Sequence, residues 1–182
     1  MITTRRISSI MRATRWDRFM SSSAVKVHWT EDKKVAIVTL NDPKKLNALN
    51  ASMGEEFKSL VNKLCEDADT KGLGAVVLTG EGRAFSAGGD LQFLRSRSRD
   101  SPTRNAIIMR RFYERFLSLR KLPVPIVAAI NGPAIGAGLA VALACDVRVA
   151  AEGAKMGITF VGTCTLHTFQ RVLTCSLHHY FS

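Results

Sequence analysis

Long apolar runs and paired cysteines are missing from this 182-residue chain. No apolar run reaches the roughly 18 to 20 residues of a membrane-spanning helix, because Asn131, Gly132 and Pro133 interrupt the longest one, residues 124–143. The four cysteines form no CxxC pair, which argues against a zinc or thioredoxin-like motif and favours reduced thiols in an intracellular core. Hydrophobic residues still make up 46% of the chain, enough for one domain with a buried core.

Acidic residues are also scarce, with 15 Asp and Glu against 26 Lys and Arg, a net charge of +11. The excess lies in two blocks: residues 1–20 hold five arginines and one acid, and residues 95–120 hold eight arginines and two acids. The first block has the Arg-rich, acid-poor composition of a mitochondrial targeting peptide, so we expect residues 1–23 to be a disordered targeting peptide and the protein to act in the matrix. A basic N-terminus without targeting function is the alternative.

The second basic block is a candidate anion-facing surface, although a solvated helix face commonly has this composition. No zinc-finger spacing and no aromatic pattern of an RNA-recognition motif accompanies it. We therefore expect neither a nucleic-acid nor a membrane partner. RNA binding through this arginine-rich face remains a less favoured alternative.

Strand-like and helix-like segments alternate along the chain, which favours an α/β layered fold with a largely parallel sheet. Residues 25–30 and 35–40 are predicted to form a hairpin, followed by a helix that Asn50 or Ser52 caps. Alternating and β-branched runs predict further strands, and apolar residues at helical spacing predict further helices. The additional strands are expected at 74–79, 126–130 and 146–150, and the additional helices at 102–122 and 139–145.

Two glycine-rich turns are candidates for the functional site. The first, RAFSAGGDL at 83–91, follows a strand, and the second, NGPAIGAGLAVALACD at 131–146, leads into a helix. Turns of this kind leave backbone N–H groups that attract negative charge. For the first turn alone the simpler interpretation is a strand-to-helix connection, with glycines at positive φ and Asp90 as a helix cap.

These two turns, their spacing and the segment NDPKKLNAL at 41–49 together resemble the enoyl-CoA hydratase/isomerase family, also called the crotonase family. The similarity runs from about Val25 to Gly162. It implies a crotonase-like spiral of ββα units over residues 24–162 that binds an acyl-CoA thioester in mitochondrial fatty-acid metabolism. Coenzyme A would be part of the substrate, and the resemblance implies no separate cofactor and no metal.

The resemblance also implies a set of site residues. Family members bind the thioester oxygen with two backbone N–H groups, and the matching residues here are Gly89 and Ala137. Together they would stabilise an enolate-like intermediate, with roughly 3 kcal/mol from each donor. The arginines of 95–120 are further candidates for the 3′-phosphate, with plain surface charge as the alternative. The residues implied for binding coenzyme A are Lys44, Lys45, Leu46, Ala48, Ala87, Gly88, Asp90 and Leu91.

The sequence departs from the family at the residues that would move protons. Family hydratases use two carboxylates, but the matching positions hold Ala140 and Phe160. General acid–base catalysis therefore has no candidate at either position. Asp90 is the remaining candidate, although helix capping is its simpler role. A catalytically inactive acyl-CoA-binding fragment is thus the alternative to an active enoyl-CoA hydratase or isomerase.

The end of the chain is the second departure. Residues 163–182 contain no PGxGG-type segment and no helical pattern, whereas the family continues into further helices that cover the acyl pocket. We expect a divergent tail on a C-terminally truncated member, with a genuine divergent terminus as the alternative. The family's trimers and hexamers are not expected without those helices.

Overall fold

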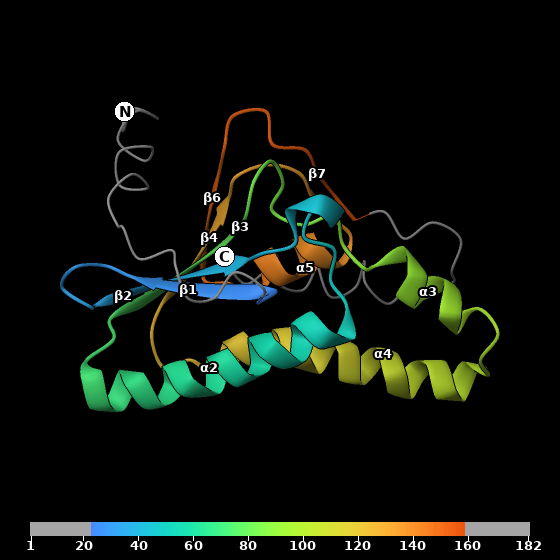
Figure 1. Ribbon diagram of the computed structural model, residues 1–182, viewed down its shortest axis with the longest axis horizontal. Helices are drawn as coiled ribbons and strands as arrows, with labels where there is room; N and C mark the ends of the chain where they lie inside the picture. The colour runs from blue at the N-terminus through green and yellow to red at the C-terminus, as the bar shows by residue number, and fades with distance from the viewer. Residues whose placement is uncertain (1–22, 159–182) are drawn as a thin grey trace, which may run out of the picture.

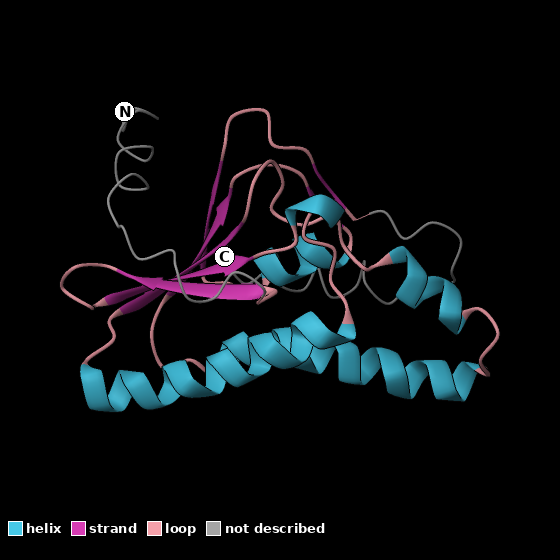
Figure 2. Ribbon diagram, viewed as in Figure 1, coloured by secondary structure: helices cyan, strands magenta, loops and turns pink. Residues whose placement is uncertain are grey.

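A five-stranded sheet with two long helices on one face forms the frame of the molecule (Figures 1 and 2). The structure, a computed structural model, describes residues 23–158; the predicted targeting peptide, Phe160 and the tail lie outside the described residues. Strands β1 (Val25–Trp29) and β2 (Val35–Leu40) pair antiparallel, which confirms the predicted hairpin. Strands β3 (Ala75–Gly80), β4 (Ile126–Ile130) and β6 (Val147–Ala150) extend the sheet in parallel, in the order β1-β2-β3-β4-β6.

Helices make the crossovers that parallel strands need. Helix α2 (Ala51–Lys71) connects β2 to β3, and α5 (Ala137–Leu143) lies between β4 and β6. The connection from β3 to β4 contains α3 (Leu91–Arg97), α4 (Pro102–Leu117) and the 3-10 helix η2 (Ser118–Lys121). In Figure 1, α2 and α4 run below the sheet, while α3 lies at the right and α5 near the centre.

Helix boundaries follow local signals, although the helix predicted at 102–122 ends as an α-helix at Leu117 and the helix predicted at 139–145 is displaced. The Asn50 side chain accepts a hydrogen bond from the Met53 N–H at 2.9 Å, so Asn50 rather than Ser52 caps α2. Helix α5 begins at Ala137, two residues before the predicted start at Leu139. The reason is Gly136, whose φ of 53° turns the chain into the helix earlier than the apolar pattern indicates.

Three short elements were not anticipated. The 3-10 helix η1 (Pro43–Lys45) lies in a segment that was predicted as a loop. Strands β5 (Ala134–Ile135) and β7 (Met156–Gly157) form a separate two-stranded parallel sheet. Elements of two or three residues carry no periodic signal, so sequence patterns do not detect them.

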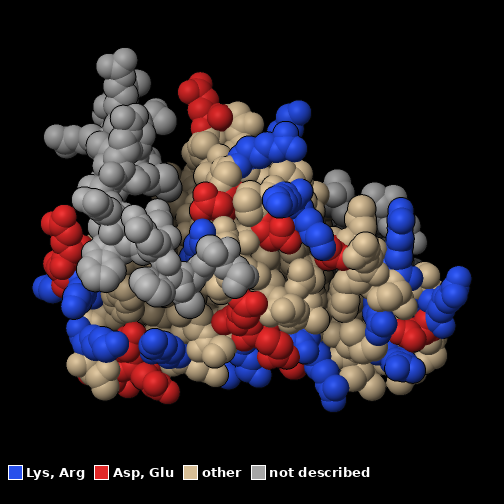
Figure 3. Space-filling view, viewed as in Figure 1, with Lys and Arg blue, Asp and Glu red and all other residues tan. Residues whose placement is uncertain are grey.

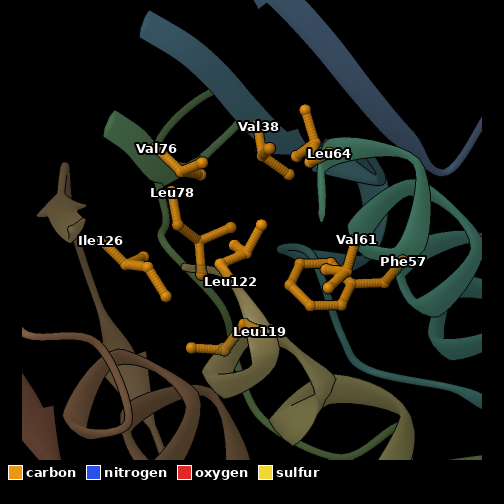
Figure 4. A pocket seen from close by; sticks show the side chains of 9 residues that line it. All are labelled: Val38, Phe57, Val61, Leu64, Val76, Leu78, Leu119, Leu122 and Ile126. Carbon is orange, nitrogen blue, oxygen red and sulfur yellow. The ribbon is translucent and has the colours of Figure 1, made fainter. Parts of the chain in front are cut away.

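The core lies between the sheet and helices α2 and α4. Phe57 of α2 and Phe116 of α4 are almost fully buried, and their ring centroids lie 5.7 Å apart. A small apolar cavity, lined by nine residues of the sheet, α2 and the η2 region, remains beside them (Figure 4). All nine lining side chains are hydrocarbon, so this cavity offers no polar group that could orient a ligand. No helix between residues 23 and 158 is long and apolar enough to cross a membrane.

Two leucines near the end of α4 test this description of the core. Leu119 is 1% exposed and lines the cavity, whereas Leu117 is 37% exposed. We expect Leu119→Ala to lower the free energy of unfolding by about 2–5 kcal/mol, because it enlarges an apolar void. The same truncation at Leu117 should cost about 1 kcal/mol or less. Urea unfolding measures both, and equal losses would contradict this assignment of the core.

Candidate functional site

Three turns meet at one edge of the sheet. They are the first turn (residues 43–49), the second turn (residues 81–90) and the third turn (residues 131–138), which follow β2, β3 and β4. Because these strands are parallel, their carboxyl ends lie at the same edge, where open α/β sheets bind ligands. The position of the turns is therefore a consequence of the strand order.

Two asparagine side chains hold the second turn in shape. The Asn47 amide donates to the carbonyls of Glu81 and Ala84 at 2.9 and 2.8 Å, and Asn47 is fully buried. The Asn131 amide donates to the Gly80 carbonyl at 2.9 Å and accepts from the Gly80 N–H at 3.2 Å. Both asparagines supply partners that these carbonyls would otherwise lack. Neither role was predicted from the sequence. The only local sign of these roles is an asparagine next to an apolar or glycine-rich segment.

The first and second turns are joined by backbone hydrogen bonds. The Ala87 N–H donates to the Leu46 carbonyl at 2.9 Å, and the Asp90 N–H donates to the Leu49 carbonyl at 2.8 Å. Between them, the Leu49 N–H donates to the Gly88 carbonyl at 2.7 Å. This ladder brings together the two segments that were predicted to bind coenzyme A.

The second and third turns are joined in the same way. The N–H groups of Phe85 and Ser86 both donate to the Pro133 carbonyl at 3.1 Å, and the Ile135 N–H donates to the Ser86 carbonyl at 2.9 Å. The turns approach so closely at Gly88, where φ is 92°, that a Cβ would lie 2.6 Å from the Ile135 oxygen. Only glycine fits this contact.

The N–H groups of Gly89 and Ala137, which the resemblance singles out, donate to no acceptor among residues 23–158. The turns that carry them are adjacent, because a Cβ on Gly88 would lie 3.4 Å from the Ala137 nitrogen. Gly136, the N-cap of α5, has no side chain to satisfy the first N–H groups of that helix. Gly89 is half-buried and Ala137 is buried. The arrangement presents two neighbouring donors in a partly water-excluded site.

Asp90 has a structural role at the same place. Its Oδ1 accepts from the N–H groups of Gln92 and Phe93 at 2.8 and 3.0 Å, which confirms the prediction that it caps α3. Its Oδ2 lies 3.5 Å from the Lys45 Nζ. The Phe93 N–H and the Lys45 charge lower the pKa of Asp90, although burial opposes them. The Asp90 carboxylate is thus ionised, and each of its two oxygens has a partner within residues 23–158.

The other residues predicted to bind coenzyme A lie along the joined turns with different exposure. Lys44 and Ala87 are exposed, and Leu91 is 68% exposed. Leu46 is half-buried and Ala48 is buried. Lys44 and Leu91 therefore offer side chains to a ligand, whereas Ala48 can contribute only backbone atoms.

A group for proton transfer is missing from the described part of the site. Ala140 is half-buried on α5, one helical turn beyond Ala137, at the position that the resemblance assigns to a carboxylate. Burial raises the pKa of Cys145 to about 12 and also raises the pKa of Cys65, so neither thiol is a nucleophile at neutral pH. Residues 23–158 contain no cluster of side chains that could hold a metal ion.

The arginine-rich block lies on α3 and α4 and the segments beside them. Figure 3 shows basic side chains gathered at the right-hand end of the molecule, over α3 and the start of α4. Arg97 and Arg104 pair with Asp100, and Arg115 pairs with Glu55. The other arginines of the block form no ion pair within residues 23–158, namely Arg95, Arg99, Arg110, Arg111 and Arg120.

Known proteins are similar to this chain in sequence and in fold. The family model for enoyl-CoA hydratase/isomerase matches residues 30–174. A Mycobacterium tuberculosis protein named "Probable enoyl-CoA hydratase echA14" is 39% identical over 71% of this chain and 48% of its own length. The short-chain-enoyl-CoA hydratase of Clostridium acetobutylicum is 35% identical over 72% of this chain and 49% of its own. The crystal structure of an enoyl-CoA hydratase from Polaromonas sp. JS666 superposes with a TM-score of 0.66 at 33% identity, over 75% of this chain and 51% of that one.

These similarities cover only part of the related proteins and correct one prediction. The chain spans about half the length of the curated relatives it matches.

The predicted mitochondrial matrix location is wrong, because the relatives come from bacteria such as M. tuberculosis, C. acetobutylicum and Bacillus subtilis, which have no mitochondria. The arginine-rich composition of residues 1–20 misled the prediction, since basic N-termini without targeting function share it.

The close approach of the turns can be tested at Gly88. Gly88→Ala would place a Cβ against the Ile135 carbonyl and impose a side chain at positive φ. We expect a loss of about 3–4 kcal/mol of unfolding free energy, from backbone strain and steric overlap together. Gly153→Ala is the matched control, because its φ is 75° and no atom lies within 4 Å of its Cβ position; it should cost only about 1–2 kcal/mol. If urea unfolding gave equal losses, the close contact between the turns would be disproved.

Proposed function

Because the chain belongs to the enoyl-CoA hydratase/isomerase family, we propose that it binds an acyl-CoA thioester whose carbonyl oxygen accepts hydrogen bonds from Gly89 and Ala137. The observation that supports this most strongly is the pair of adjacent N–H groups without an acceptor in residues 23–158. When a proton leaves the carbon next to the thioester, negative charge develops on this oxygen. Two fixed donors stabilise that enolate by roughly 3 kcal/mol each.

The joined first and second turns would hold the coenzyme A portion of the ligand. Lys44 is exposed and has no ion-pair partner among residues 23–158, so it is available for a phosphate group. Backbone groups near Leu46, Ala48 and Ala87 would line the path of the pantetheine. Coenzyme A enters as part of the substrate in this proposal, and no further cofactor is required.

Two outcomes of binding are open to this chain. The first is turnover of the enoyl-CoA hydratase or isomerase type, in which the enolate is an intermediate. The second is binding without turnover, and Ala140 favours it because no carboxylate stands beside the donor pair on α5. Both outcomes use the same donors, so they differ in proton transfer rather than in recognition.

Hydration of crotonyl-CoA, measured beside a calorimetric titration with butanoyl-CoA, separates these outcomes. Binding with turnover supports an active enzyme, and binding without turnover supports an acyl-CoA-binding protein. Failure to bind butanoyl-CoA more tightly than the coenzyme A thiol would reject the proposed function in both forms.

Proline substitution at the start of α5 tests the donor itself. Ala137→Pro removes one N–H at the first position of a helix, where proline fits the backbone. Affinity for butanoyl-CoA should fall about tenfold, as expected for one lost hydrogen bond, and any hydration rate should fall by about 100-fold or more. Affinity for the coenzyme A thiol should not change.

The matched control is Ala51→Pro, which makes the same change at the first position of α2, two residues after the first turn and outside the donor pair. It should leave both affinities unchanged. If Ala137→Pro bound butanoyl-CoA as tightly as the unmodified chain, the Ala137 N–H would not be a donor to the thioester.

A further inference from the structure

An ion pair stands beside the proposed donor pair. Asp90 directly follows Gly89 in the chain, and its carboxylate lies 3.5 Å from the Lys45 Nζ. The Asp90 side chain is only 11% exposed, while that of Lys45 is 52% exposed. The carboxylate therefore has little water to screen it, and Lys45 is the only cation within ion-pair distance of it among residues 23–158.

A buried carboxylate at this position opposes the proposed chemistry. Covalent geometry keeps the Asp90 carboxylate within about 8 Å of the Gly89 nitrogen, and at that distance two negative charges repel appreciably in a partly buried site. The Asp90 carboxylate also has a structural role, because its other oxygen caps α3. An enolate oxygen bound at Gly89 would thus be destabilised unless a positive charge offset Asp90.

We infer that Lys45 is a positioning residue that neutralises Asp90 beside the oxyanion site, and that it is not a ligand of the coenzyme A phosphates. The inference rests on the proposed function, since it concerns the same two donors. Lys45 lies at the end of η1, and its pairing with Asp90 also ties the first turn to the second. Lys44, the neighbouring residue, remains the cation available to a phosphate.

The charges on the surrounding segments support this division between the two lysines. The first turn carries Lys44 and Lys45, the second turn carries Arg83, and α3 carries Arg95 and Arg97. Among them, only Lys45 pairs with Asp90, and Arg97 pairs instead with Asp100. Removing Lys45 alone would therefore leave Asp90 without a neighbouring cation among residues 23–158 while its negative charge faces a bound anion.

Acetoacetyl-CoA provides a direct probe, because its enolate absorbs in the near ultraviolet and forms without any catalytic base. The apparent pKa of bound acetoacetyl-CoA reports how strongly the site stabilises an enolate. We expect Lys45→Met to raise this pKa by about one unit, a tenfold loss of enolate stabilisation, while the affinity for the coenzyme A thiol is unchanged. Lys45→Arg should restore the original pKa.

Two further variants separate neutralisation of Asp90 from other roles of Lys45. Lys45→Met/Asp90→Asn removes both charges and retains a capping oxygen, so the pKa should return close to its value in the unmodified chain. Lys44→Met should show the opposite pattern, with weaker binding of the coenzyme A thiol and an unchanged enolate pKa. A merely structural role of Lys45 would not predict recovery on removal of the Asp90 charge.

The outcomes distinguish this inference from the function on which it rests. If the unmodified chain does not lower the pKa of acetoacetyl-CoA below its value in free solution, the proposed function fails and the inference fails with it. If the unmodified chain lowers this pKa and Lys45→Met lowers it equally, only the inference is overturned. Weaker binding of the coenzyme A thiol by Lys45→Met, with an unchanged enolate pKa, would show that Lys45 contacts a phosphate instead.

Discussion

The site depends on the hydrogen-bonded ladder that joins the three turns after β2, β3 and β4. In that ladder the N–H groups of Ala87, Asp90 and Ile135 are all consumed by neighbouring carbonyls. Gly89 and Ala137 lie in the joined turns, and their N–H groups have no acceptor within residues 23–158. The proposed binding geometry is thus a property of the backbone, and the backbone holds it without a ligand, as preorganised electrostatic stabilisation requires.

Such a backbone site demands unusual conformations nearby. Leu46 and Asn47 both adopt a left-handed φ, 52° and 55°, which is unfavourable for residues with side chains. The buried Asn47 amide offsets this strain by satisfying two carbonyls of the second turn. Gly88 and Gly138 remove the side chains that would separate the turns, since a Cβ on either would overlap the neighbouring turn. Strain, hydrogen bonding and close packing therefore support one another at this edge of the sheet.

Sequence patterns predicted the elements well and the contacts between them less well. Strands β2, β3 and β4 followed from β-branched runs, and the cap at Asn50 from a local motif. The resemblance, rather than any periodicity, pointed to Gly89 and Ala137. The roles of Asn47 and Asn131 could not be predicted, because their partners lie more than 30 residues away along the chain. The start of α5 was misplaced because a glycine at positive φ, not an apolar stripe, begins that helix.

The described part of the chain thus combines the two proposed donors with Ala140 at the position that the resemblance assigns to a carboxylate. The central claim is that a thioester oxygen binds between Gly89 and Ala137. Infrared difference spectroscopy of bound butanoyl-CoA, labelled with ¹³C at the thioester carbonyl, tests it most directly. Two hydrogen bonds to the oxygen should weaken the C=O bond and shift its stretching band to lower frequency than in free butanoyl-CoA. A bound ligand with an unshifted band would contradict the account.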